Sequence, residues 1–133
     1  MQSKALPRHS SDWFIRNEDR TIGNPNLLYR NCDNPLIVID HNCAFDTGFN
    51  PKNFLQNHIF SSAFKQVLED WVLQEEMELW LKSALPAYRK ACDNLPLEWA
   101  WANEERDLPA AYNRSYTDET VRRIDNGKLW SIS

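Results

Sequence analysis

Cysteine, long apolar runs and glycine are all scarce in this sequence, and each shortage excludes a class of protein. The cysteines form an odd set without metal-like spacing, which indicates reduced thiols rather than a disulfide framework: Cys32, Cys43 and Cys92. No stretch approaches the roughly 18 apolar residues that span a bilayer, and the N-terminal MQSKALPRHSSD lacks the apolar region of a signal peptide. We therefore predict a cytoplasmic protein with no membrane partner.

Positive charge and histidine are also in short supply. The net charge is −4 and the pI about 5.3, with both signs spread along the chain, so no cationic face for nucleic acid is predicted. His9, His41 and His58 lack the spacing of zinc ligands. His58 lies beside Phe54 and Ile59 in a predicted helix, and we interpret it as a packed residue rather than a catalytic one.

The sequence does contain enough apolar residues for one folded unit. Its 133 residues, 42% of them hydrophobic, suffice for a single domain over 1–133 but not for two. The predicted fold class is mainly α with a small β-hairpin, an α+β architecture. Its parts are a loop at 17–26, a hairpin at 26–40 and a helical region at 51–130.

The hairpin is predicted from two apolar runs, NLLYR and PLIVID, which a turn-forming tetrapeptide at 31–34 separates. In the second run, four successive apolar residues from Leu36 to Ile39 predict a strand that is buried on both faces. Asp40 would then emerge directly from the end of a buried strand.

Capping residues and helical periodicity predict the later elements. Asn50 followed by Pro51 indicates the start of a short helix. A longer helix is predicted over roughly 65–94, and Pro86 should kink or interrupt it because proline removes a backbone donor. A last helix is predicted over about 118–126.

Five tryptophans have spacings that favour core positions over a ligand cage: Trp71, Trp80, Trp99, Trp101 and Trp130.

Three polar residues beside the hairpin are the candidate site. Asp19 and Asn24 have the spacing Asp-x-x-x-x-Asn within a loop, and a hairpin would bring Asp40 alongside them. Phosphoryl transfer needs a group that orients the attacking hydroxyl and hard oxygen ligands for Mg²⁺, which this set supplies. Spacing alone leaves the question open, because ordinary surface turns use the same residue types.

Two longer strings resemble a known family. NEDRTIGNPNLLY followed by LIVIDHNCAF resembles the catalytic and metal-binding segments of HipA-like kinase domains, and the likeness continues through FNPKNFLQNHIF to LPLEW. More distantly, the pattern is similar to type II phosphoinositide 4-kinases. The resemblance implies the C-terminal lobe of a protein-kinase-like fold that transfers the ATP γ-phosphate, with Mg²⁺, to a serine or threonine hydroxyl of a protein. A lipid hydroxyl is the minor alternative.

The same resemblance implies a role for each candidate residue. Asp19 matches the catalytic aspartate, while Asn24 and Asp40 match the Mg²⁺ ligands. Arg20 follows the catalytic aspartate, whereas ordinary protein kinases place an arginine before it. The residues that would bind the nucleotide itself are not implied.

The sequence has no match for the N-terminal lobe of such kinases. None of the three glycines is clustered, and no strand lysine precedes Asp19. We therefore expect the C-terminal lobe alone, completed by an N-lobe in trans or by self-association, with an exposed apolar face that includes Leu6, Trp13, Phe14 and Phe45. The alternative is a catalytically silent lobe that acts as a binding or regulatory module.

Overall fold

The structure, a computed structural model, describes residues 11–32 and 36–132. The described elements are a helical turn at 11–14, β1 (Leu27–Tyr29), β2 (Leu36–Val38), α2 (Pro51–Asn57), α3 (Ser61–Glu69), α4 (Trp71–Asp93), the 3-10 helix η1 (Leu97–Ala100) and α5 (Arg114–Arg122). The predicted fold class is confirmed, because the chain is mostly helical with one two-stranded antiparallel hairpin. The assignment of 1–133 to a single domain stays a prediction.

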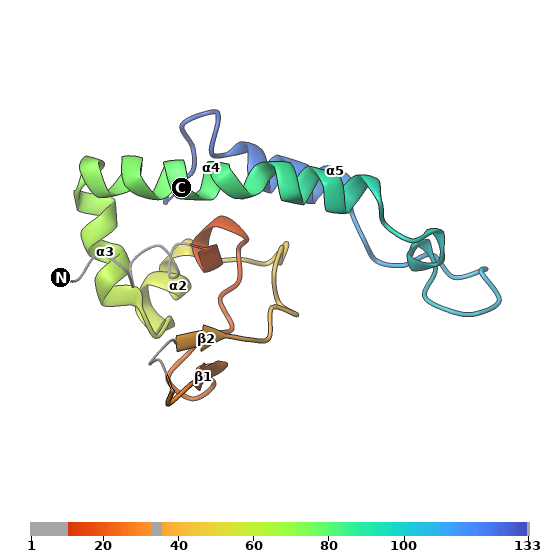
Figure 1. Cartoon of the computed structure of the whole chain (residues 1–133), viewed down its shortest axis with the longest axis horizontal. Coiled ribbons are helices and arrows are strands. Elements are labelled where there is room, and N and C mark those ends of the chain that lie inside the picture. The colour runs from red at the N-terminus through yellow and green to blue at the C-terminus, as the bar shows by residue number, and fades with distance from the viewer. Residues whose placement is uncertain (1–10, 33–35, 133) are drawn as a thin grey trace.

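The longest helix, α4, has the other elements arranged around it (Figure 1). Helix α5 runs beside α4, and the two are joined by the hydrogen bond from the Tyr88 hydroxyl to Asp118 Oδ1 at 2.8 Å. Helices α2 and α3 and the hairpin lie on one side of α4 in this view, whereas the segment 95–112 extends beyond its end (Figure 1). No described helix combines the length and the apolar character that crossing a membrane requires.

The hairpin forms where it was predicted, with shorter strands. Leu27 pairs with Val38 and Tyr29 with Leu36 in an antiparallel register. The prediction that the second strand is buried on both faces is wrong, because Ile37 remains 37% exposed. Successive side chains of a strand point to opposite faces, and this two-stranded ribbon is covered on one face only.

Helix α2 begins as its capping residues predicted. The Asn50 side-chain oxygen accepts the backbone N–H groups of Lys52 and Asn53 at 3.0 and 3.3 Å, and Pro51 occupies the first turn. These bonds satisfy donors that have no partner inside the helix, so a local sequence signal suffices to set this boundary.

The predicted long helix is interrupted at Asp70 rather than at Pro86. Asp70 has an extended backbone, and its carboxylate accepts the N–H groups of Val72 and Leu73 at 2.9 and 3.3 Å, which ends α3 and starts α4. Pro86 lies within α4, which continues through it. An aspartate cap therefore determines the break, since it provides the acceptors that a new helix start needs.

The last helix begins earlier than predicted. Asn113 caps α5, because its side-chain oxygen accepts the Tyr116 N–H at 3.0 Å. The helix therefore starts at Arg114 rather than near residue 118, and Thr117 is buried inside it. The chain turns near the predicted stop, where Gly127 adopts a φ of 74°.

Trp13 is the centre of the hydrophobic core. Its side chain is 1% exposed and packs against Phe49, Phe54 and Phe64 with ring centroids 4.7 to 5.8 Å apart within the group. The indole N–H also donates to the Leu129 carbonyl at 2.6 Å. The first helical turn is thereby joined to α2, α3 and the end of the chain.

The predicted exposed apolar face is therefore largely wrong. Trp13 and Phe14 are buried core residues, and Phe45 packs partly buried against the same core, while Leu6 lies outside the described residues.

Four of the five tryptophans predicted to be in the core are exposed instead. Trp71 and Trp99 are 68% and 65% exposed, and Trp80 and Trp101 are also accessible. Trp130 alone packs against the core, and its indole N–H donates to Glu78 Oε1 at 2.8 Å. Helical spacing places side chains on one face, but it does not show whether another element covers that face.

Candidate active site

The loop 17–26 folds back on itself so that Asp19 and Asn24 meet. Thr21 and Asn24 exchange two backbone hydrogen bonds of 3.1 Å each, which closes a tight turn around Ile22 and Gly23. The Asn24 side-chain amide N–H then donates to Asp19 Oδ2 at 3.3 Å. The spacing of Asp19 and Asn24 thus brings the two side chains into contact, with the carboxamide oxygen of Asn24 left for another partner.

Asp40 follows the hairpin in an unusual backbone conformation. The Ile39 N–H bonds to the Asn26 carbonyl at 3.0 Å and extends the ladder by one step beyond β2. Asp40 then has a φ of 56°, in the left-handed region that aspartate tolerates better than most residues. Its Oδ1 accepts the Asn42 N–H at 3.3 Å, and the side chain is exposed. Such local strain is common at functional positions.

A buried polar cluster underlies the loop. Asp12, Arg20 and His58 are each at most 3% exposed. Arg20 Nε donates to Asp12 Oδ2 at 2.6 Å and Nη2 to Oδ1 at 3.3 Å, a two-point ion pair. His58 Nδ1 accepts the Phe60 N–H, so Nε2 carries the hydrogen that bonds Asp12 Oδ2 at 2.9 Å. His58 is therefore the packed residue that the sequence predicted, stacked on Phe54 at 4.2 Å.

Arg20 connects this cluster to all three candidate residues. It directly follows Asp19 in the chain. Its Nη1 donates to the carbonyls of Pro25 at 3.3 Å, Asn26 at 2.7 Å and Ile39 at 3.0 Å. Pro25 directly follows Asn24, and Ile39 directly precedes Asp40. One buried guanidinium thus holds the backbone next to Asp19, Asn24 and Asp40.

Cys43 shares its surroundings with the candidate carboxylates. Partial burial and then the neighbouring Asp19 raise the pKa of the Cys43 thiol, and Asp40 and Asp46 act in the same direction. A thiol whose pKa is raised stays protonated near neutral pH, which argues against a nucleophilic role. Asp19 also acts on this thiol through a side-chain hydrogen bond, whereas Asp40 acts through its charge.

A shallow cavity of about 330 Å³ lies beside Asp19. Its lining is almost wholly polar: Glu18, Asp19, Thr21, Cys43, Asp46, Asn53 and Asn57. Of the three candidate residues, Asp19 lines this cavity, whereas Asn24 and Asp40 do not. Carboxylate and carboxamide oxygens are hard donors of the kind that Mg²⁺ prefers. Within residues 11–32 and 36–132, the lining of this cavity included, no group of three or more His, Cys, Asp or Glu side chains is arranged to hold a metal ion.

One family model matches the chain over a range that contains the candidate site. The family model for HipA-like kinases matches residues 9–133, which is nearly the whole chain. The chain therefore belongs to the HipA-like kinase family. No curated protein and no solved structure matches it. The likeness to phosphoinositide 4-kinases stays a prediction.

Sequence reasoning missed the residues that support the site. Neither Asp12 nor its hydrogen bond to His58 was predicted, because this contact joins positions 46 residues apart in the chain. One signal was present: Asp12 directly precedes Trp13, Phe14 and Ile15, and a charged residue beside a core run needs a partner of opposite charge.

The buried cluster of Asp12, Arg20 and His58 predicts that the folded protein loses stability in acid. Burial acts to raise the pKa of Asp12, but hydrogen bonds from His58 and Arg20 outweigh it and hold this pKa below the ordinary 3.8. A depressed carboxyl pKa stabilises the folded state above the unfolded pKa, and that stability is lost as pH falls through the folded value. We expect the free energy of unfolding in urea to fall below about pH 4. Asp12→Asn should flatten this dependence, and an unchanged slope would contradict the assignment.

Proposed function

We propose that this chain supplies the catalytic lobe for magnesium-dependent transfer of the ATP γ-phosphate to a serine or threonine hydroxyl of a protein. The proposal rests on Arg20, which directly follows Asp19 in the chain. Its Nη1 bonds the carbonyls of Pro25, Asn26 and Ile39, and so holds the backbone beside Asn24 and Asp40. The family membership of residues 9–133 supports a kinase function of this general kind.

The proposed roles follow from the chemistry of phosphoryl transfer. Asp19 accepts the hydrogen of the attacking hydroxyl and orients it towards the γ-phosphate. The side-chain oxygens of Asn24 and Asp40 hold Mg²⁺, which when bound neutralises negative charge on the nucleotide phosphates. Because the three groups sit on backbone held by a buried guanidinium, their positions are set before substrate arrives.

The nucleotide requires further contacts. Kinases hold the phosphates with a glycine-rich loop and a strand lysine, and the three glycines of these 133 residues are not clustered. We propose that an N-terminal lobe provides these donors, either in trans from another protein or through self-association. The lobe described here should then transfer phosphate slowly when it is tested by itself.

The test is a phosphotransfer assay with ATP labelled at the γ-phosphate. The chain is incubated with Mg²⁺, a candidate N-lobe protein and mixed serine-containing acceptor proteins, and in a parallel arm with phosphatidylinositol vesicles. Label on protein serine or threonine supports the proposal, and label on lipid assigns the lipid-kinase alternative. No transfer to either acceptor, together with no Mg-ATP binding by calorimetry, would contradict a catalytic function.

A second function, a binding or regulatory module, is favoured by one specific surface. An apolar groove of about 490 Å³ lies at the end of α4 and includes Cys92, Leu95, Leu97, Trp99 and Tyr112. Leu97 is 84% exposed and Trp99 is 65% exposed, which is unusual for such large apolar side chains. This function predicts no measurable heat on titration with Mg-ATP, whereas the kinase proposal predicts binding when the N-lobe is present.

A further inference from the structure

A second cavity, of about 520 Å³, carries an excess of positive charge. It lies where the first helical turn, α5 and the C-terminal turn meet, apart from the lining of the Asp19 cavity. Its lining contains the cations Arg16, Arg123 and Lys128 and a single carboxylate, Glu119. The cavity wall therefore has a formal charge of +2 at neutral pH, in a chain whose net charge is −4.

Arg123 is buried and has no negatively charged partner among residues 11–32 and 36–132. Its side chain donates to the carbonyls of Thr120, Trp13 and Phe14 at 3.0, 3.1 and 2.7 Å, and all three acceptors are neutral. Burial, and then the positive charge of Arg16, lower the pKa of Arg123 to about 10. Carbonyl oxygens satisfy donors but do not neutralise a charge, so a buried cation of this kind is costly to the folded state.

Arg16 presents an unsatisfied donor close by. Its Nη1 donates to the Tyr116 hydroxyl at 2.8 Å, and its guanidinium lies 5.5 Å from the centre of the Tyr116 ring. Its Nε is buried and has no hydrogen-bond partner among the described residues. Arg16 also has a φ of 54°, a conformation that costs energy in a non-glycine residue. Nothing in the described part of the chain gives Arg16 or Arg123 a carboxylate ion pair.

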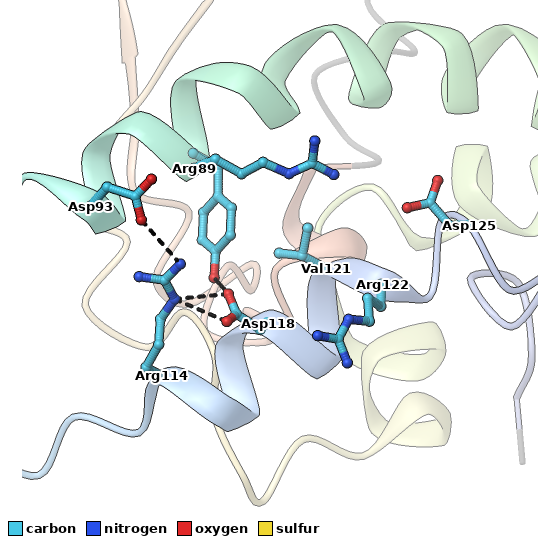
Figure 2. Close-up of a pocket in the computed structure, with 8 residues that line it drawn as sticks. Arg89, Asp93, Arg114, Asp118, Val121, Arg122 and Asp125 are labelled. Carbon is cyan, nitrogen blue, oxygen red and sulfur yellow. Dashed lines mark hydrogen bonds and ion pairs between the residues drawn. The ribbon is translucent and has the colours of Figure 1, made fainter.

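Another cavity in the molecule has a lining whose charges balance. Figure 2 shows Arg114 bonded to Asp118 at 2.9 and 3.0 Å and paired with Asp93 at 3.7 Å. That cavity is lined by three arginines and three aspartates, so its formal charge is balanced. The cavity around Arg16 and Arg123 lacks such a balance, and an external anion would provide it.

We propose that the cavity lined by Arg16, Arg123 and Lys128 binds a phosphate group. A phosphate monoester carries a charge of about −1.5 to −2 at neutral pH, which matches the charge of the cavity wall. Its acceptor oxygens would bond the guanidinium of Arg16 and the ammonium of Lys128, as charge-assisted hydrogen bonds. The source is either free phosphate or a phosphorylated side chain, which share this chemistry.

The experiment measures binding of inorganic phosphate by calorimetry and by thermal unfolding, at neutral pH and at an ionic strength held constant with chloride. We expect saturable binding and a rise in Tm. Arg16→Gln and, separately, Lys128→Gln should each weaken binding about tenfold or more. Arg123 is left unchanged because it also holds the core carbonyls of Trp13 and Phe14. Arg89→Gln, an exposed arginine in the balanced cavity, is the matched control and should bind as the unmodified chain does.

The outcomes distinguish free phosphate from a phosphorylated side chain, and both from the absence of a specific phosphate site. Tighter binding of O-phosphoserine than of inorganic phosphate assigns the cavity to a phosphorylated side chain, and equal binding assigns it to free phosphate. The proposal is overturned if phosphate acts no differently from chloride, or if Arg16→Gln and Lys128→Gln both bind phosphate like the control. Neither Mg²⁺ nor ATP is present, so this result is independent of the kinase proposal.

Discussion

Replacing Arg20 with leucine is expected to lower the free energy of unfolding by about 3–5 kcal/mol, because it removes one partner of a buried ion pair. The change leaves the Asp12 carboxylate buried with only His58 and the Asn17 side-chain amide as described partners. It also removes the donor to the carbonyls of Pro25, Asn26 and Ile39. A leucine side chain can replace the buried volume but none of these contacts. Urea unfolding at neutral pH measures the difference.

A matched control uses an arginine whose ion pair is exposed. Arg114 pairs with Asp118 through Nε at 2.9 Å, but its side chain is 39% exposed. Arg114→Leu should therefore cost no more than about 1 kcal/mol, as is usual for surface pairs. If the two substitutions had equal effects, Arg20 would not be the residue that holds the loop and the hairpin together.

Changing Asp40 to asparagine is expected to reduce phosphotransfer about a hundredfold or more in the N-lobe assay, because one negative ligand of Mg²⁺ is lost. Asparagine tolerates the left-handed backbone of Asp40 almost as well as aspartate does, so the φ of 56° should be retained. The Asp40 side chain is exposed, so the substitution leaves the buried cluster around Arg20 intact. Activity should therefore fall while the urea midpoint stays the same.

The same assay distinguishes a specific role from a general loss of negative charge. Asp125→Asn removes an exposed carboxylate that lines the balanced cavity, and we expect it to leave phosphotransfer unchanged. Asp19→Asn should match or exceed the effect of the Asp40 change, because a positioned base contributes about 10²- to 10⁴-fold. Full activity in the Asp40 variant would remove its assignment as a metal ligand.

Local signals in the sequence predicted the elements that local contacts determine. Asn50 and Pro51 gave the start of α2 because the cap bonds within its own first turn. The apolar runs on either side of 31–34 gave the antiparallel hairpin for a similar reason. The five-residue spacing of Asp19 and Asn24 also predicted their proximity, since a tight turn closes between them.

Long-range packing determined what the sequence could not predict. Trp13 is in the core because α2, α3 and Leu129 surround it, whereas Trp71 is exposed because no described element covers its face of α4. The sequence did not predict the three carbonyl acceptors of Arg20. They belong to Pro25 and Asn26, at the other end of the loop, and to Ile39, just after β2.

The most direct test of the account is where a divalent ion binds. Mn²⁺ can stand in for Mg²⁺ at oxygen ligands and broadens the NMR signals of nearby amides. In a titration of the isotope-labelled chain, we predict that the amides of Asp19, Asn24 and Asp40 broaden first, and that Asp40→Asn abolishes this preference. Broadening that begins at another acidic surface, such as Glu75 and Glu76 on α4, and spares the loop would contradict the assignment of the site.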